Sequence, residues 1–183
     1  MDKKDGETMR KKEKLYNNIK SALLVSLIIL SSYFYLPLPS VSGLSLQTVF
    51  INLAALLLPP VQGLFTVGLW LLMGAVGIPV FSGGGGIGKL FGVTGGFYWG
   101  FLAAVPLMSK LKGKEVDLKR YLLSLIAGLL TEHVFAVAFM CFHNGGNVFS
   151  AVASISLPFI VGDILKCFLS AFAAVKINKV IYK

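Results

Sequence analysis

The sequence predicts an all-α integral membrane protein in which six transmembrane helices form one bundle. Hydrophobic residues make up 56% of the 183-residue chain and charged residues only 14%, and the mean hydropathy is +0.79. These values lie far from those of soluble globular domains. The hydrophobic residues gather in six long runs, and almost all basic residues lie between or outside these runs. The chain is therefore expected to fold within a membrane.

The six apolar runs define the expected helices in order along the chain. They cover residues 19–36, 44–58, 61–81, 93–108, 121–142 and 155–177. A helix that crosses the hydrocarbon core needs about 20 residues, so the second and fourth runs are short. We expect flanking residues to extend them or neighbouring helices to shelter them. Without a repeat or a second domain, the sequence predicts a single membrane domain over 19–183, preceded by a basic segment at 1–18.

The distribution of basic residues predicts the orientation of the chain. Fifteen of the 17 lysines and arginines fall on one side of the six-helix arrangement: Lys3, Lys4, Arg10, Lys11, Lys12, Lys14, Lys20, Lys110, Lys112, Lys114, Lys119, Arg120, Lys176, Lys179 and Lys183. By the positive-inside rule this side is cytoplasmic, together with both termini. Topology thus accounts for the net charge of +9, and no nucleic-acid partner is needed. Only Lys89 and Lys166 lie toward the outer side and need another explanation.

Two other features of the sequence have simple interpretations. The basic, then apolar N-terminus also fits a secretory signal peptide, but its apolar run is long and further runs follow, so we expect a retained first helix. Cys141 and Cys167 fall in different runs without metal-ligand spacing, which favours buried structural thiols. We expect no metal and no cofactor.

Asp163 and Lys166 form the most informative pair, because they interrupt the otherwise apolar stretch 155–175. A charged side chain at the centre of a membrane helix costs roughly 2.5–3.5 kcal/mol on insertion scales, so such residues usually face a protein interior and mark function. Residues three apart lie on one face of a helix. The sequence therefore predicts a polar ligand site at this pair.

A glycine-rich loop, residues 82–92, connects the third and fourth runs on the expected outer side. Residues 83–89 match the first seven positions of the phosphate-binding pattern G-x-x-x-x-G-K, but Leu90 replaces the required Ser or Thr. We therefore exclude nucleotide binding and expect a lid in which Gly84 and Gly85 bring backbone close to a ligand. A flexible connection is the alternative. Beyond the loop, glycines 92, 96 and 100 recur every four residues, which favours close packing of helices.

Other polar residues near the apolar runs are candidates for the same site. Gln47 and Thr48 open the second run, where they can bind a neutral polar ligand or make capping or interhelical bonds. Thr94 follows the glycine loop and can line the mouth of a pocket. Glu132 and His133 interrupt the fifth run, either as a proton relay or ligand site or as a structural pair.

Several sequence runs resemble those of one known family. The matching runs are 46–48 (LQT), 77–81 (GIPVF), 94–97 (TGGF) and 157–166 (LPFIVGDILK). In order and spacing they resemble the BioY family, the biotin-binding membrane subunits, or S components, of energy-coupling-factor (ECF) transporters. The resemblance covers essentially residues 36–175.

The resemblance implies a multi-pass subunit of a prokaryotic cell membrane that binds biotin from outside. Such subunits are not enzymes and have no ATPase of their own. They work with a membrane-embedded coupling protein and two ABC-type ATPases, and the small residues on the first helix usually face the coupling protein. Ala22 and Ser26 hold the corresponding positions here.

The resemblance also implies roles for the candidate residues. Asp163 would accept hydrogen bonds from the urea N–H groups of biotin, and Lys166 would attract its carboxylate or donate to its urea oxygen. Gln47 and Thr48 would add urea contacts, and Trp70 and Phe81 are candidates for an apolar wall, with ordinary core packing as the alternative. Many relatives carry an Arg at or near Gly85. Lys89 is the nearby substitute expected to serve the carboxylate.

Two other functional classes compete with this interpretation. A proton-coupled secondary transporter would use Glu132, His133 and Asp163 as a relay and would work without partner subunits. A membrane enzyme would need a nucleophile with a base or a metal site, and the sequence contains neither G-x-S-x-G nor H-E-x-x-H.

Overall fold

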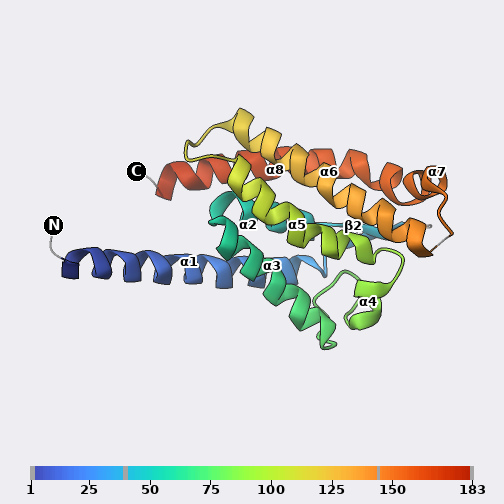
Figure 1. Ribbon diagram of the computed structural model, residues 1–183, viewed down its shortest axis with the longest axis horizontal. Helices are drawn as coiled ribbons and strands as arrows, with labels where there is room; N and C mark the ends of the chain where they lie inside the picture. The colour runs from blue at the N-terminus through green and yellow to red at the C-terminus, as the bar shows by residue number, and fades with distance from the viewer. Residues whose placement is uncertain (1–2, 39–40, 144, 182–183) are drawn as a thin grey trace.

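The fold is a bundle of long helices that lie side by side along one axis (Figure 1). The computed structural model describes residues 3–38, 41–143 and 145–181. Its elements, in chain order, are α1 (Lys3–Ser31), β1 (Tyr35–Leu38), β2 (Val41–Ser45), α2 (Gln47–Leu57), α3 (Pro60–Ala75), α4 (Ile87–Phe91), α5 (Gly95–Leu111), α6 (Leu118–His143), α7 (Val148–Ala151), the π-helical turn η1 (Val152–Ser156) and α8 (Leu157–Ile181).

The six predicted helices are present as α1, α2, α3, α5, α6 and α8, but several ends differ from the prediction. The first was expected to reach residue 36 and ends at Ser31, because Pro37 lies in an antiparallel hairpin formed by β1 and β2. The all-α prediction was wrong at this hairpin. The third was expected to reach residue 81 and ends at Ala75, because Gly77 follows with φ at 99° and Pro79 comes two residues later.

Other boundaries also differ from the prediction. The fourth helix, predicted at 93–108, is α5 and extends to Leu111, and the last begins at Val148 rather than 155 because α7 and η1 run directly into α8. From Lys3 onward, the basic segment predicted at 1–18 continues into the first predicted span as one helix. Two helical runs in the described part of the chain, 118–143 and 148–181, are long and apolar enough to cross a membrane by length and composition.

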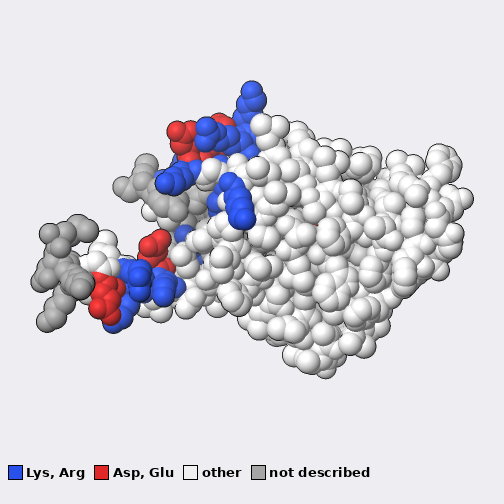
Figure 2. All heavy atoms as spheres, viewed as in Figure 1, with Lys and Arg blue, Asp and Glu red and all other residues white. Residues whose placement is uncertain are grey.

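Charged residues gather at one end of the molecule. The start of α1 and the end of α8 lie at this end (Figure 1). On the face drawn in Figure 2, lysines and arginines cluster there, and the rest of the surface is uncharged. Large apolar side chains are exposed along the helices, among them Phe65, Leu72 and Val161, each at least 66% exposed. Such an apolar outer surface fits a lipid environment, where the solvent is itself apolar.

Prolines and a half-buried lysine shape the turn between α2 and α3. Leu58 is extended because Pro59 follows it, and Pro60 occupies the first turn of α3, where no N–H is needed. The Lys112 ammonium donates to the carbonyls of Ala55, Leu56 and Leu58 at 2.7–3.1 Å and so caps the C-terminus of α2. Burial, with a smaller contribution from the positive charge of Lys20, lowers the pKa of Lys112 to about 8.

Glycines allow α5 and α6 to approach each other closely. A Cβ at Gly96 would lie 2.7 Å from Cα of Ala136, and a Cβ at Gly100 would lie 2.9 Å from Cα of Glu132. The predicted packing role is therefore confirmed for Gly96 and Gly100. Gly92 differs, because it ends α4 and a Cβ there would lie 2.8 Å from the carbonyl oxygen of Gly88.

A valine at position 96 tests this close packing. Gly96→Val places side-chain atoms against the backbone of α6, and we expect a stability loss of about 1–3 kcal/mol from overpacking. The measurement is the midpoint of thermal unfolding in detergent. Gly68→Val is the matched control, because the nearest atom to a Cβ at this helical glycine lies 4.0 Å away. Equal midpoints for both variants would contradict the packing role.

Candidate functional site

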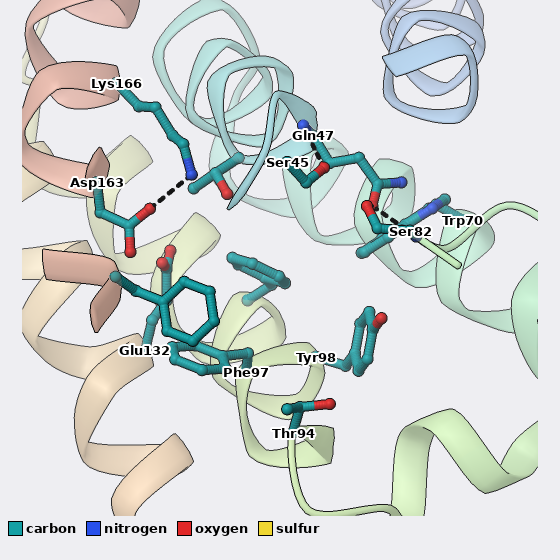
Figure 3. Close-up of a pocket in the computed structure, with 13 residues that line it drawn as sticks. Ser45, Gln47, Trp70, Ser82, Thr94, Phe97, Tyr98, Glu132, Asp163 and Lys166 are labelled. Carbon is teal, nitrogen blue, oxygen red and sulfur yellow. Dashed lines mark hydrogen bonds and ion pairs between the residues drawn. The ribbon is translucent and has the colours of Figure 1, made fainter. Parts of the chain in front are cut away.

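A cavity of about 100 Å³ lies inside the bundle, between α2, α3, α5, α6 and α8 (Figure 3). We call it the chamber. Its lining combines charged, hydroxyl and aromatic side chains: Ser45, Gln47, Thr48, Trp70, Ser82, Thr94, Phe97, Tyr98, Phe101, Glu132, Phe159, Asp163 and Lys166. A cavity lined by aromatic rings and a few convergent polar groups is typical of sites for small organic ligands.

Asp163 and Lys166 form a buried ion pair on the chamber side of α8. Lys166 Nζ lies 2.8 Å from Asp163 Oδ1, and Lys166 and Asp163 are 8% and 7% exposed. The predicted single polar spot is therefore present, because positions three apart share one face of the helix. On its other side, Asp163 Oδ2 lies 3.5 Å from His133 Nε2, but the two groups are not aligned for a hydrogen bond.

The local structure of α8 places this pair. The π-helical turn η1 immediately precedes α8, and π turns insert an extra residue into a helix and are frequent at functional sites. Phe159, in the first turn of α8, lines the chamber, and Asp163 follows one helical turn later. Ser170 Oγ donates to the carbonyls of Lys166 at 2.7 Å and Val49 at 3.3 Å, which ties α8 to α2.

Glu132 enters the same chamber from α6. This residue is 3% exposed, and its Oε1 atom has no hydrogen-bond partner among the described residues. In Figure 3 the carboxyl group points toward Asp163 and Lys166, so three ionisable side chains converge at this end of the chamber. The neighbouring His133 packs edge-on against Phe97, with ring centroids 5.4 Å apart.

Gln47 and Ser82 form the opposite end of the chamber. The Gln47 amide donates to the carbonyls of Val80 at 2.7 Å and Ile28 at 3.2 Å. Its oxygen accepts from Ser82 Oγ at 2.8 Å and Ser82 N at 3.2 Å. Every hydrogen-bonding position of the amide is thus occupied, which favours the interhelical role that the sequence left open for this residue.

Aromatic rings form the wall beside Ser82. Trp70 Nε1 donates to the Val80 carbonyl at 3.0 Å, and its ring packs edge-on against Phe81 with centroids 5.2 Å apart. Phe81 in turn contacts Tyr98, with ring centroids 4.5 Å apart. Phe81 is only 1% exposed and supports the wall from behind, whereas Trp70 and Tyr98 line the chamber.

The glycine loop lines the chamber at Ser82, and its glycines lie outside the lining. Gly83, Gly84 and Gly86 adopt positive φ values of 80°, 125° and 101°, and Phe81 and Gly84 exchange two backbone hydrogen bonds. A Cβ at Gly85 would collide with the carbonyl oxygen of Ile78. An Arg at position 85 would therefore need a different loop conformation here.

The predicted site residues separate into two groups. Gln47, Thr48, Trp70, Thr94, Asp163 and Lys166 line the chamber, whereas Phe81, Gly84, Gly85 and Lys89 do not. Lys89 Nζ lies 3.5 Å from the carbonyl oxygen of Ser82, one residue behind the lining. Ala22 and Ser26, the predicted partner contacts, are exposed on α1, and the Ser26 hydroxyl donates to the Ala22 carbonyl at 2.9 Å.

Six lining residues were not predicted from the sequence: Ser45, Ser82, Phe97, Tyr98, Phe101 and Phe159. The aromatic residues on α5 had a detectable signal, because 97, 98 and 101 follow Thr94 at spacings of three, four and seven, which share one helix face. Glu132 had been considered as a ligand site or structural residue. The two serines carry no pattern of their own; Ser45 reaches the chamber from the end of β2 and Ser82 from the loop that follows α3.

An apolar helical bundle around a buried, charged chamber defines a membrane protein with an internal site for a small ligand. The chain belongs to the BioY family, whose model matches residues 7–183. This match confirms the family resemblance found in the sequence.

Individual proteins and a solved structure agree with the family match. The chain is 30% identical to the biotin transporter BioY of Thermotoga maritima, over 88% of this chain and 95% of that protein. It is 38% identical to the probable biotin transporter BioY of Pyrococcus horikoshii, over 67% of this chain and 72% of that protein. It is also similar to a crystal structure of the S component for biotin from an ECF-type ABC transporter. The TM-score is 0.79 and the identity 25%, over 92% of this chain and 93% of that one.

Proposed function

We propose that this chain is the biotin-binding S component of an ECF-type vitamin transporter, which captures biotin on the outer side of a prokaryotic cell membrane. The buried Asp163–Lys166 pair at the chamber carries the proposal, because two charges within a membrane helix need a polar partner. Membership of the BioY family agrees with a transport subunit and not with an enzyme.

The proposed topology has six membrane-crossing helices, α1, α2, α3, α5, α6 and α8, in one membrane domain over residues 19–183. The basic segment 1–18 and both termini lie in the cytoplasm, and the loop 82–92 faces outward. The clustering of basic residues at the end that holds both termini supports this orientation (Figure 2). In this orientation the glycine loop lies at the opposite end of the molecule, on the outer side from which biotin enters.

The proposed orientation of biotin follows from the two polar ends of the chamber. Asp163 and Lys166 bind the urea ring at their own end of the chamber, and Thr48 and Thr94 add contacts from the sides. The thioether ring and the alkyl chain lie among Trp70 and the other aromatic rings. The carboxylate then points toward Ser82 and the glycine loop, where Lys89 supplies the positive charge. Gly84 and Gly85 shape that loop. Gln47 and Phe81 support the wall of the chamber.

The proposed partners are a membrane-embedded coupling protein and two ABC-type ATPases, which supply the energy for release of biotin to the cytoplasm. Ala22 and Ser26 stand exposed on α1 and offer a surface on which another helix can pack closely. No cofactor or metal is needed for this role.

Substitution of the ion pair tests the proposed site. Asp163→Asn and Lys166→Ala each remove one charge and leave the other buried without its partner, so we expect biotin affinity to fall by roughly 100-fold or more. Equilibrium binding of labelled biotin to the purified chain in detergent measures this. Lys176→Ala, at an exposed lysine of the same helix, is the control. Full affinity in both variants, with the wild-type chain binding biotin, would exclude this site.

The role of Lys89 has a separate test. Lys89→Ala removes the cation nearest to Ser82, and we expect a partial loss, about 10-fold in biotin affinity, because a charge-assisted hydrogen bond is lost. Biotin methyl ester, which lacks the carboxylate charge, should bind the variant and the wild-type chain equally. Unchanged biotin affinity in Lys89→Ala, beside abolished binding in Lys166→Ala, would show that Lys89 has no such role.

The proton-coupled alternative predicts a different transport behaviour. Glu132, His133 and Asp163 do lie near one another, as a relay requires. We nevertheless expect vesicles that contain only this chain to accumulate no biotin under an imposed pH gradient, because the energy comes from the ATPases. Uptake of labelled biotin is the measurement, and accumulation that collapses with the gradient would support the alternative.

A further inference from the structure

The chamber contains one ionisable side chain to which the proposed mechanism gives no role. Asp163 already has Lys166 at 2.8 Å and His133 at 3.5 Å. Glu132 lies in the same chamber with Oε1 unpaired, and no basic group forms an ion pair with it among the described residues. A buried polar atom without a partner destabilises the fold, so its retention at a ligand site needs a reason.

The position of Glu132 is determined by the packing of the backbone. Gly100 of α5 packs against Cα of Glu132, and α6 cannot move away from α5 without losing this contact. The carboxyl group points toward the Asp163 end of the chamber (Figure 3). Glu132 is 3% exposed, so water does not satisfy it from the surface. The free oxygen is therefore available to a group that enters the chamber.

The proposed ligand has an edge that matches an uncharged carboxyl group. In a cyclic urea, each N–H lies beside the shared C=O. A carboxylic acid pairs with such an edge through two hydrogen bonds, since its O–H donates to the urea oxygen while its carbonyl oxygen accepts from N–H. A carboxylate offers acceptors alone and would repel the urea oxygen. A second negative charge beside Asp163, without a cation of its own, would also be costly in a buried site.

Resting on the proposed function, we infer that Glu132, as the uncharged acid, binds one N–H/C=O edge of the biotin urea ring through a pair of hydrogen bonds. Asp163 then serves the second N–H group. Glu132 thereby matches the uncharged urea ring with one donor and one acceptor. The biotin carboxylate stays at the other end of the chamber, away from both acidic residues.

Two substitutions test this role. Glu132→Gln keeps one donor and one acceptor, so we expect biotin affinity within about threefold of wild type. Glu132→Leu keeps the approximate volume and removes both bonds, so we expect a loss of about 10- to 100-fold for two hydrogen bonds. Binding is measured by isothermal titration calorimetry in detergent, and thermal unfolding of each ligand-free variant verifies its fold.

A second ligand separates recognition from a structural role. 2-Iminobiotin carries a cyclic guanidine that is a cation at neutral pH and presents N–H donors in place of the urea oxygen. Wild-type Glu132 can release its proton and accept from this cation, whereas the amide introduced by Glu132→Gln stays neutral. We therefore expect this substitution to weaken 2-iminobiotin binding about tenfold more than biotin binding.

Three results would overturn the inference. The first is wild-type biotin affinity in Glu132→Leu, and the second is an equal loss in Glu132→Gln and Glu132→Leu. The third is an equal effect of Glu132→Gln on both ligands, as a structural role would give. Failure of the wild-type chain to bind biotin would instead refute the proposed function on which the inference rests.

Discussion

Asp163 and Lys166 form an ion pair inside a helix whose outer face is apolar, and both residues are more than nine-tenths buried. Such a pair is tolerated within a membrane only if the charges are shielded from lipid and paired with each other or with a ligand. The chamber meets this requirement. Five helices surround it, and large apolar side chains cover the outside, so the bundle is organised around a polar interior.

Close contact between α5 and α6 completes the polar end of the chamber. Gly96 and Gly100 bring the two backbones together, and this approach places Glu132 beside the ion pair while Phe97 fills the space near His133. In an apolar solvent, helices gain little from burying apolar surface, so small residues at the contact and satisfied polar groups provide most of the specificity. The same glycines therefore stabilise the bundle and position a site residue.

A second network fixes the outer end of the chamber. Gln47 and Trp70 both donate to the carbonyl of Val80, and Gln47 also accepts from Ser82. These bonds hold the segment between α3 and the glycine loop against α2. The glycines with positive φ follow this fixed segment and form the loop beside the wall.

The sequence by itself determined the membrane setting, the six helices, the family and the ion pair, because hydropathy, charge distribution and helical spacing act locally along the chain. The packing role of Gly96 and Gly100 was also predictable, since small residues at four-residue spacing lie on one strip. Ser45 lines the chamber from the end of β2 and Ser82 from the loop after α3, and Phe81 lies behind the wall because Trp70 and Tyr98 occupy the front. Tertiary structure alone decided these positions, and the convergence of Glu132 with Asp163, because each depends on contacts between segments far apart in the chain.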